Sequence, residues 1–164
     1  MKSLKYLFLL CVVLLGVTSC KEKTREQAIQ DFQSGLSAAD STAMLALCDG
    51  CMELLKAKDI DRALDMLSLY DEELHTVAHL PDHFRQSYRR MFTIFPVYNY
   101  RRQYYSFQLE GCNDVKYEVV FVEQENSDYN TPYKTSFMFN PVKVDGEWYL
   151  CMKTADQNID ESHR

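Results

Sequence analysis

The chain has 164 residues, of which 18 are Lys or Arg and 24 are Asp or Glu, so its net charge is −6. Nucleic-acid binding needs a cationic face that displaces counterions from phosphates, and we therefore expect no nucleic-acid partner for this acidic chain. The chain has only five Gly and four Pro, which argues against disorder and a repeat array. Its eleven Tyr and nine Phe indicate strands around a well-filled interior.

The first twenty residues have the outline of a secretory signal. Lys2 and Lys5 flank an apolar run at 6–17, and small residues then lead into Cys20. The run is about twelve residues long, whereas a helix needs about twenty to cross a bilayer, so we expect residues 1–19 to be removed. The end of this segment, Val17-Thr18-Ser19-Cys20, also resembles the lipobox of bacterial lipoproteins. The alternatives are a signal peptide that ends in an incidental cysteine and an uncleaved anchor.

The lipobox resemblance implies a location in the cell envelope and a membrane as partner. Cleavage before Cys20 leaves its thiol to carry a diacylglycerol and its amine to be acylated, which tethers the chain to a membrane leaflet through residues 20–26. Loss of Lys2 and Lys5 leaves 16 basic and 24 acidic side chains, a mature net charge of −8. Lys21 stands in place of the aspartate of the familiar inner-membrane retention signal, which favours the outer membrane of a Gram-negative bacterium.

Helices are predicted through the first half of the remaining chain. Thr24 followed by Gln27 resembles a capping box, which predicts a short helix to about residue 33. Asp40 and Ser41 are candidate caps for a second helix, whose apolar face extends to residue 55. A shorter helix is predicted to begin at 59–61, with the apolar residues within 63–67 facing the core. A last helix follows Pro81 and ends before residue 96.

The second half alternates with period two, which predicts strands at 98–109, 115–123, 133–144 and 148–152. Asp145-Gly146 predicts a tight turn between the last two, and Pro141 indicates an edge or a bulge because it cannot donate to a ladder. Residues 154–164 form a polar tail. Helices followed by a meander define an α+β fold, with N-terminal helices packed on a curved antiparallel sheet of about four strands.

Two segments carry a resemblance to a domain family. Residues 56–67, Lys-Ala-Lys-Asp-Ile-Asp-Arg-Ala-Leu-Asp-Met-Leu, resemble the opening of SnoaL-like domains, the superfamily that includes nuclear transport factor two. Residues 144–150, Val-Asp-Gly-Glu-Trp-Tyr-Leu, are similar to its closing hairpin. The resemblance covers residues 27–153. It implies a cone in which a curved sheet wraps the helices, often around a pocket, and a family of isomerases, dehydratases and domains without chemistry.

The predicted interior of the cone is the candidate ligand site. We expect a small-ligand cavity lined by the inward-facing residues Tyr105, Phe107, Tyr117, Val119, Phe121, Phe137, Phe139 and Trp148. No carboxylate stands alone on an apolar strand face and no catalytic motif is present, which favours a non-catalytic module that needs no cofactor. Two alternatives remain: a filled interior that leaves a protein-binding module, and an isomerase or dehydratase that uses the same pocket.

Histidines and cysteines form two further candidate sites. His75, His79 and His83 have the four-residue spacing of metal ligands on a helix, although Leu80-Pro81 should break that helix; the alternative is a histidine-rich polar loop. Cys48-Asp49-Gly50-Cys51 has the spacing of a redox pair, yet it lies on an apolar helix face, where packing or a distorted disulfide is favoured. With Cys112 and Cys151, four thiols allow three pairings. In a simple meander, Cys112 and Cys151 lie too far apart to pair with each other.

A block of basic residues follows the acidic helices. Residues 83–109 contain no acid and five arginines: Arg85, Arg89, Arg90, Arg101 and Arg102. Arginine binds carboxylate and phosphate in a bidentate manner, so the block could bind an anionic ligand. The favoured interpretation is that these arginines pair with acids of the same domain.

Overall fold

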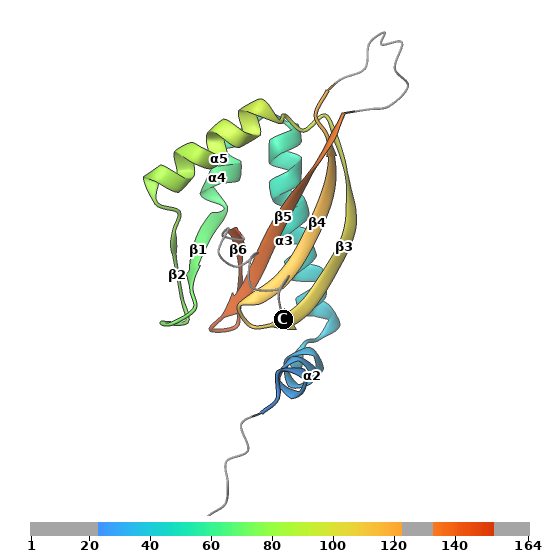
Figure 1. Cartoon of the computed structure of the whole chain (residues 1–164), viewed down its shortest axis with the longest axis vertical. Helices are drawn as coiled ribbons and strands as arrows, with labels where there is room; N and C mark the ends of the chain where they lie inside the picture. Colours follow the sequence, from blue (N-terminus) through green and yellow to red (C-terminus); the bar gives the residue numbers. More distant parts are fainter. Residues whose placement is uncertain (1–22, 123–132, 153–164) are drawn as a thin grey trace, which may run out of the picture.

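The computed structural model describes residues 23–122 and 133–152. The predicted signal at 1–19, the lipidation residue Cys20 and the tail at 154–164 lie outside this part. The α+β class is confirmed, with helices and one curved sheet (Figure 1). The sheet differs from the prediction, because it has six strands in the order β2-β1-β6-β5-β4-β3 and is mixed, where about four antiparallel strands were predicted.

Two capping boxes begin the first helices. Helix α2 (Arg25–Gly35) begins after Thr24, whose side chain accepts from the Gln27 N–H, as predicted. Helix α3 (Ala38–Lys56) begins after Ser37, so the predicted caps Asp40 and Ser41 are wrong. Asp40 is instead the reciprocal partner of Ser37 and accepts a hydrogen bond from its N–H at 2.9 Å. This start joins α2 and α3 through a two-residue corner at 36–37.

Two shorter helices follow. Helix α4 (Ile60–Asp65) begins after Asp59, whose carboxylate accepts from the Arg62 N–H. Helix α5 (Asp82–Ile94) begins directly after Pro81, as predicted from the suitability of proline for a first helical turn.

A hairpin that the helical pattern did not predict lies between α4 and α5. It consists of β1 (Leu67–Asp71) and β2 (Thr76–His79). The Asp71 carboxylate closes the connection, because Oδ1 accepts from the N–H groups of Glu73 and Leu74 at 3.0 and 2.9 Å. Leu67, predicted on a helix, pairs with Leu150 of β6 in parallel, which adds the hairpin to the sheet and makes the sheet mixed.

The predicted meander is confirmed as β3 (Asn99–Leu109), β4 (Cys112–Val120), β5 (Lys134–Val144) and β6 (Glu147–Met152). Pro141 lies in β5, an inner strand of the sheet, and the β5–β6 register continues through Pro141 without a shift, so neither the predicted edge nor the predicted bulge is found. Proline is tolerated there because the β4–β5 ladder ends at residue pair 115–139, before Pro141. Beyond that pair a side-chain hydrogen bond replaces the backbone ladder between the two strands: the Asn113 N–H donates to Asn140 Oδ1 at 2.8 Å.

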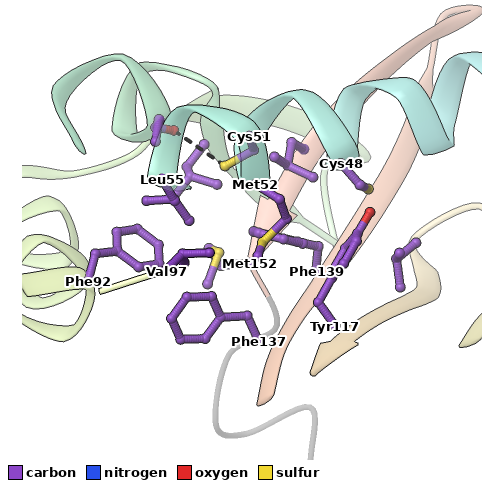
Figure 2. Packing of buried hydrophobic residues seen from close by; sticks show 14 of the residues in the cluster. Cys48, Cys51, Met52, Leu55, Phe92, Val97, Tyr117, Phe137, Phe139 and Met152 are labelled. Atoms are coloured by element: carbon purple, nitrogen blue, oxygen red, sulfur yellow. Dashed lines mark hydrogen bonds between the residues drawn. The ribbon is translucent and has the colours of Figure 1, made fainter. Parts of the chain in front are cut away.

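The core lies between α3 and the face of the sheet that this helix covers. Figure 2 shows Met52 and Leu55 of α3 directed toward the side chains of β4 and β5. Four of the predicted cavity residues are in this core and are at most 5 % exposed: Tyr117, Val119, Phe137 and Phe139. Side chains of α3 therefore occupy the space in which the sequence predicts a cavity.

Candidate functional site

An open groove of about 460 Å³ lies beside the edge strand β3, at the corner between α2 and α3. This volume is within the range of small-ligand sites. Two of the residues predicted to contact a ligand, Tyr105 and Phe107, line it from β3. The full lining is Gln33, Leu36, Ser37, Ala38, Ser41, Tyr105, Ser106 and Phe107.

A bulge in β3 directs Tyr105 into this groove. Arg102 pairs with Tyr117, and Tyr104 pairs with the neighbouring residue of β4, so Gln103 is one extra residue on β3. Alternate side chains of a strand point to opposite faces, and the extra residue therefore places Arg102 and Tyr105 on the same face, toward α3. Tyr104 lies on the other face.

Aromatic contacts hold the Tyr105 ring in place. Tyr105 and Phe107 meet edge to face with ring centres 5.8 Å apart, and the Phe107 ring lies 6.2 Å from that of Trp148. The Arg102 guanidinium is 6.0 Å from the Tyr105 ring centre. Gln33 Nε2 donates to the Phe107 carbonyl at 2.6 Å, which joins α2 to the edge of the sheet. Tyr105 remains 49 % exposed and presents a supported ring to the groove.

Asp40 organises the start of α3 behind the groove. Its carboxylate accepts hydrogen bonds from Lys143 Nζ, from Trp148 Nε1 at 3.3 Å and from the Ser37 hydroxyl at 2.7 Å. The Lys143 hydrogen bond, followed by those from Ser37, holds the pKa of Asp40 well below its ordinary value of 3.8. The ionised carboxylate therefore fixes both the helix cap and the Trp148 ring that supports Phe107.

We expect the Asp40 carboxylate to make the stability of the fold depend on pH in the acidic range. Because the pKa of Asp40 is lower in the folded chain, its contribution is present above the unfolded value near 3.8 and is lost as the pH falls toward the folded value. Asp40→Asn should therefore lower the melting temperature by a constant amount from pH 5 to 7, and this difference should narrow below about pH 4. Thermal unfolding followed by circular dichroism measures it. Glu73→Gln is the control, and a difference that persists unchanged to about pH 2 contradicts the expectation.

The eight predicted ligand residues do not line one common cavity. Tyr105 and Phe107 line the groove, Trp148 supports it, and four belong to the core described above. Phe121 packs elsewhere, edge to face with Phe95 at 5.1 Å, near the end of α5. The residues that complete the groove come mostly from the α2–α3 corner. The predicted end of the first helix near residue 33 indicated this corner in the sequence, but no sequence signal indicated that it would contact the edge of the sheet.

The three histidines lie on different elements. His75 is in the β1–β2 turn, His79 ends β2, and His83 is in the first turn of α5, where its ring contacts Phe84. The continuous helix that would place them on one face is replaced by the hairpin. Within residues 23–122 and 133–152, no group of three or more His, Cys, Asp or Glu side chains is placed to hold a metal ion.

A second cavity, of about 320 Å³, lies where the β1–β2 hairpin meets the β3–β4 turn. Its lining is Tyr70, Glu72, His75, Leu109, Glu110, Gly111 and Cys112. The Tyr70 hydroxyl and His75 Nδ1 are 3.0 Å apart. Burial, followed by the charge of Glu110, raises the pKa of Tyr70. A Cβ at position 111 would displace the Tyr70 ring, because it would lie 2.3 Å from Tyr70 Cε1.

The four described cysteines are free thiols, so none of the possible disulfide pairings is formed. Cys48, Cys51 and Cys151 are buried, and Cys51 Sγ contacts the Ala63 carbonyl oxygen at 3.9 Å (Figure 2). Burial raises the pKa of Cys51 and of Cys151 to about 12, and raises that of Cys48 further. A redox cysteine needs the opposite shift, so the Cys48–Cys51 pair serves packing.

Four of the five arginines of the block pair with acids of the same domain, as favoured from the sequence. Arg85 and Arg89 of α5 bind Asp65 and Asp61 of α4. Arg101 binds Glu118 at 3.5 Å on the face away from α3. Arg102 binds Asp49 of α3 at 3.2 Å, and this pair lies between the groove and the core. These four guanidinium groups are used within the fold.

Comparison with protein-family models, with curated proteins and with solved structures finds no match to the chain. In the part of the chain that the structure describes, no helix is both long and apolar enough to cross a membrane. The groove, the hairpin cavity and the filled core are therefore the observations from which a function is inferred.

Proposed function

We propose that the chain is an envelope lipoprotein, anchored by a lipid on Cys20, whose domain binds a small ligand in the groove beside β3 and performs no chemistry there. The observation that carries the binding function is the Tyr105 ring, 49 % exposed and supported from behind by Phe107 and Arg102. An aromatic ring presented in this way supplies contact area at a low cost in conformational entropy.

The SnoaL-like assignment belongs to the same proposal. Helix α3, a break at Lys58-Asp59 and the short helix α4 follow the pattern of the family that the sequence resembles. The sheet curves around α3, and β5 and β6 form the closing hairpin (Figure 1). These features support the resemblance.

The anchor would hold the groove near the membrane. Helix α2 begins at Arg25, five residues after Cys20, and has 11 residues. An extended tether of that length spans about 17 Å, and the helix adds about 16 Å. The groove, at the far end of α2, would therefore lie within about 35 Å of the leaflet, proposed to be that of a Gram-negative outer membrane.

The lining of the groove contains serine and tyrosine hydroxyl groups but no general base. Among the described residues that line it, none is a carboxylate, an imidazole, an amine or a thiol. A hydroxyl group needs such a neighbour to activate it as a nucleophile. Asp40, which accepts from the Ser37 hydroxyl, is a weak base because its hydrogen bond with Lys143 lowers its pKa. Binding without reaction is the function that this lining supports.

A second candidate, an isomerase or dehydratase, is favoured by one observation at the hairpin cavity. Tyr70 and His75 form a hydrogen-bonded pair there, and Glu72 and Glu110 lie in the same lining. Such a set could move a proton to and from a bound carbonyl compound. This enzyme would use a different cavity from the one that the sequence predicted.

One experiment tests both the anchor and the site. The full chain is expressed with its signal in a Gram-negative host fed alkynyl palmitate, extracted in detergent and examined by native mass spectrometry. We expect the wild type to carry the label and to retain a small molecule. Cys20→Ser should lose the label, Tyr105→Ala should lose the molecule, and Tyr104→Ala, a tyrosine of similar exposure on the opposite face, should keep it.

The outcomes separate the alternatives. An unlabelled wild-type chain with its first residues still present would contradict the anchor. A molecule that remains in Tyr105→Ala but is lost in Gly111→Ala, where the added Cβ displaces Tyr70, would favour the enzyme. A chain that carries no small molecule but a second protein would favour the protein-binding module.

A further inference from the structure

The side chains that line the groove are neutral and of two kinds. Hydrogen-bonding side chains come from Gln33, Ser37 and Ser41, and apolar surface comes from Leu36, Ala38, Tyr105 and Phe107. Ser106 also borders the groove, but the alternation of β3 places its side chain on the face opposite Tyr105. Hydroxyl groups both donate and accept, and a carboxamide offers one acceptor and two donors. The lining is therefore matched to a ligand that combines many hydroxyl groups with apolar ring faces.

Two polar groups of the groove are available to such a ligand. Within the described residues, the hydroxyl group of Ser41 makes no hydrogen bond. Gln33 uses Nε2 to bind the Phe107 carbonyl, and its Oε1 accepts no hydrogen bond from the described residues. Both groups lie on the helical corner, and Tyr105 on β3 forms the facing wall.

The charges around the groove are already compensated, which argues against an anionic ligand. Arg102 binds Asp49, and Lys143 binds Asp40. The N-terminus of α3 would attract an anion, but the capping box occupies the N–H groups of Ser37 and Asp40 and places the Asp40 carboxylate beside this end of the helix. This carboxylate already supplies the negative charge that the helix end favours.

A wholly apolar ligand is also a poor match. It would cover the hydroxyl group of Ser41 and the Gln33 Oε1 without offering hydrogen bonds, and each polar group left unpaired opposes binding. The 49 % exposed Tyr105 ring, in contrast, suits a ring that carries C–H groups on its face and hydroxyl groups at its edge. Sugar rings have this arrangement.

We infer that the groove binds a neutral carbohydrate, with one sugar ring stacked on Tyr105 and its hydroxyl groups bonded to Ser41 and Gln33. The volume of about 460 Å³ accommodates more than a single pyranose ring, so an oligosaccharide is the expected ligand class. This inference rests on the proposed binding function and specifies the chemistry of its ligand.

The test uses the full chain in a detergent without a sugar headgroup. Its probes are an array of neutral glucose, mannose, galactose and N-acetylglucosamine oligosaccharides, sulfated and sialylated glycans, and a dansylated fatty acid. We expect binding to neutral glycans that the free glycan competes away. Tyr105→Ala should weaken it about tenfold or more, because a stacked ring is lost. Tyr104→Ala should change it by less than about twofold, and circular dichroism verifies that both variants fold.

Failure of this inference differs from failure of the proposed function. Binding that depends on Tyr105 but is confined to anionic glycans or to the fatty acid overturns the carbohydrate assignment and keeps the groove as the binding site. Absence of binding to every probe, or binding that Tyr105→Ala leaves unchanged, counts against both. A tenfold loss in Ser41→Ala with an intact Tyr105 would further support the hydroxyl contact.

Discussion

Phe139→Ala is expected to lower the free energy of unfolding by about 3–5 kcal/mol. The Phe139 side chain is fully buried, with its ring centre 6.0 Å from that of Tyr117, and it lies between its strand neighbours Val115 and Met152. The substitution removes apolar surface and leaves a cavity that the rigid α3–sheet interface closes only in part. Denaturant titration of the full chain measures the change.

This prediction also tests whether the cone is filled. A phenylalanine that bordered a ligand-sized void would cost less to truncate, because fewer contacts would be lost. The control is Leu74→Ala in the hairpin turn, where the side chain is 70 % exposed and the change should stay within about 0.5 kcal/mol. A Phe139→Ala cost below about 1 kcal/mol would contradict the packed interior and would reopen the case for a catalytic pocket inside the cone.

Asp49→Ala is expected to cost about 1–3 kcal/mol, because it leaves the buried Tyr117 hydroxyl without its acceptor. Tyr117 is fully buried and donates to Asp49 Oδ1. Burial, followed by the hydrogen bond to Asp49, keeps the pKa of Tyr117 above its ordinary value, so the hydroxyl remains a donor. Asp49 also forms an ion pair with Arg102, which would lose this partner in the variant. The unfolding free energy from denaturant titration measures the cost.

A double-mutant cycle makes this prediction specific. Tyr117→Phe removes the donor and should cost about 1 kcal/mol, and the double variant should cost clearly less than the sum of the two. Asp49→Asn keeps an acceptor and should be milder than Asp49→Ala. Strict additivity would mean that the Asp49–Tyr117 hydrogen bond does not contribute to stability.

The sequence predicted the elements whose signals are local. The Thr24 capping box, the restart at Asp59, the helix after Pro81 and the period-two strands are each specified within a few residues, and the structure confirms them. The start of α3 was misjudged, because Ser37 and Asp40 both suit a cap and only the reciprocal hydrogen bonds identify which residue is the cap.

The β1–β2 hairpin was missed because its signals are weak in isolation. Its strands have five and four residues, and its turn contains no glycine; His75 adopts a φ of 51°, a conformation that glycine usually supplies. The alternation of Leu67 and Leu69, followed by the turn former Asp71, was the available signal. Pairing with β6, more than 80 positions along the chain, then stabilises it.

The site was predicted in part, for a similar reason. Simple alternation places Tyr105 and Phe107 on the inner face, but it cannot show that the extra residue Gln103 also turns Arg102 inward. Nor does alternation reveal that α3 fills the cone. The groove is formed by tertiary contact between the α2–α3 corner and the sheet edge, which residue spacing does not encode.

The reactivity of the buried thiols of α3 measures local opening of the domain. Alkylating reagents attack only an accessible thiolate, and burial keeps Cys48 and Cys51 both covered and protonated. Their labelling rate therefore reports how often the helix lifts away from the sheet. A ligand that contacts both the α2–α3 corner and β3 would make this opening less frequent. Slower alkylation of the two thiols would therefore measure ligand binding without any tag or dye on the chain.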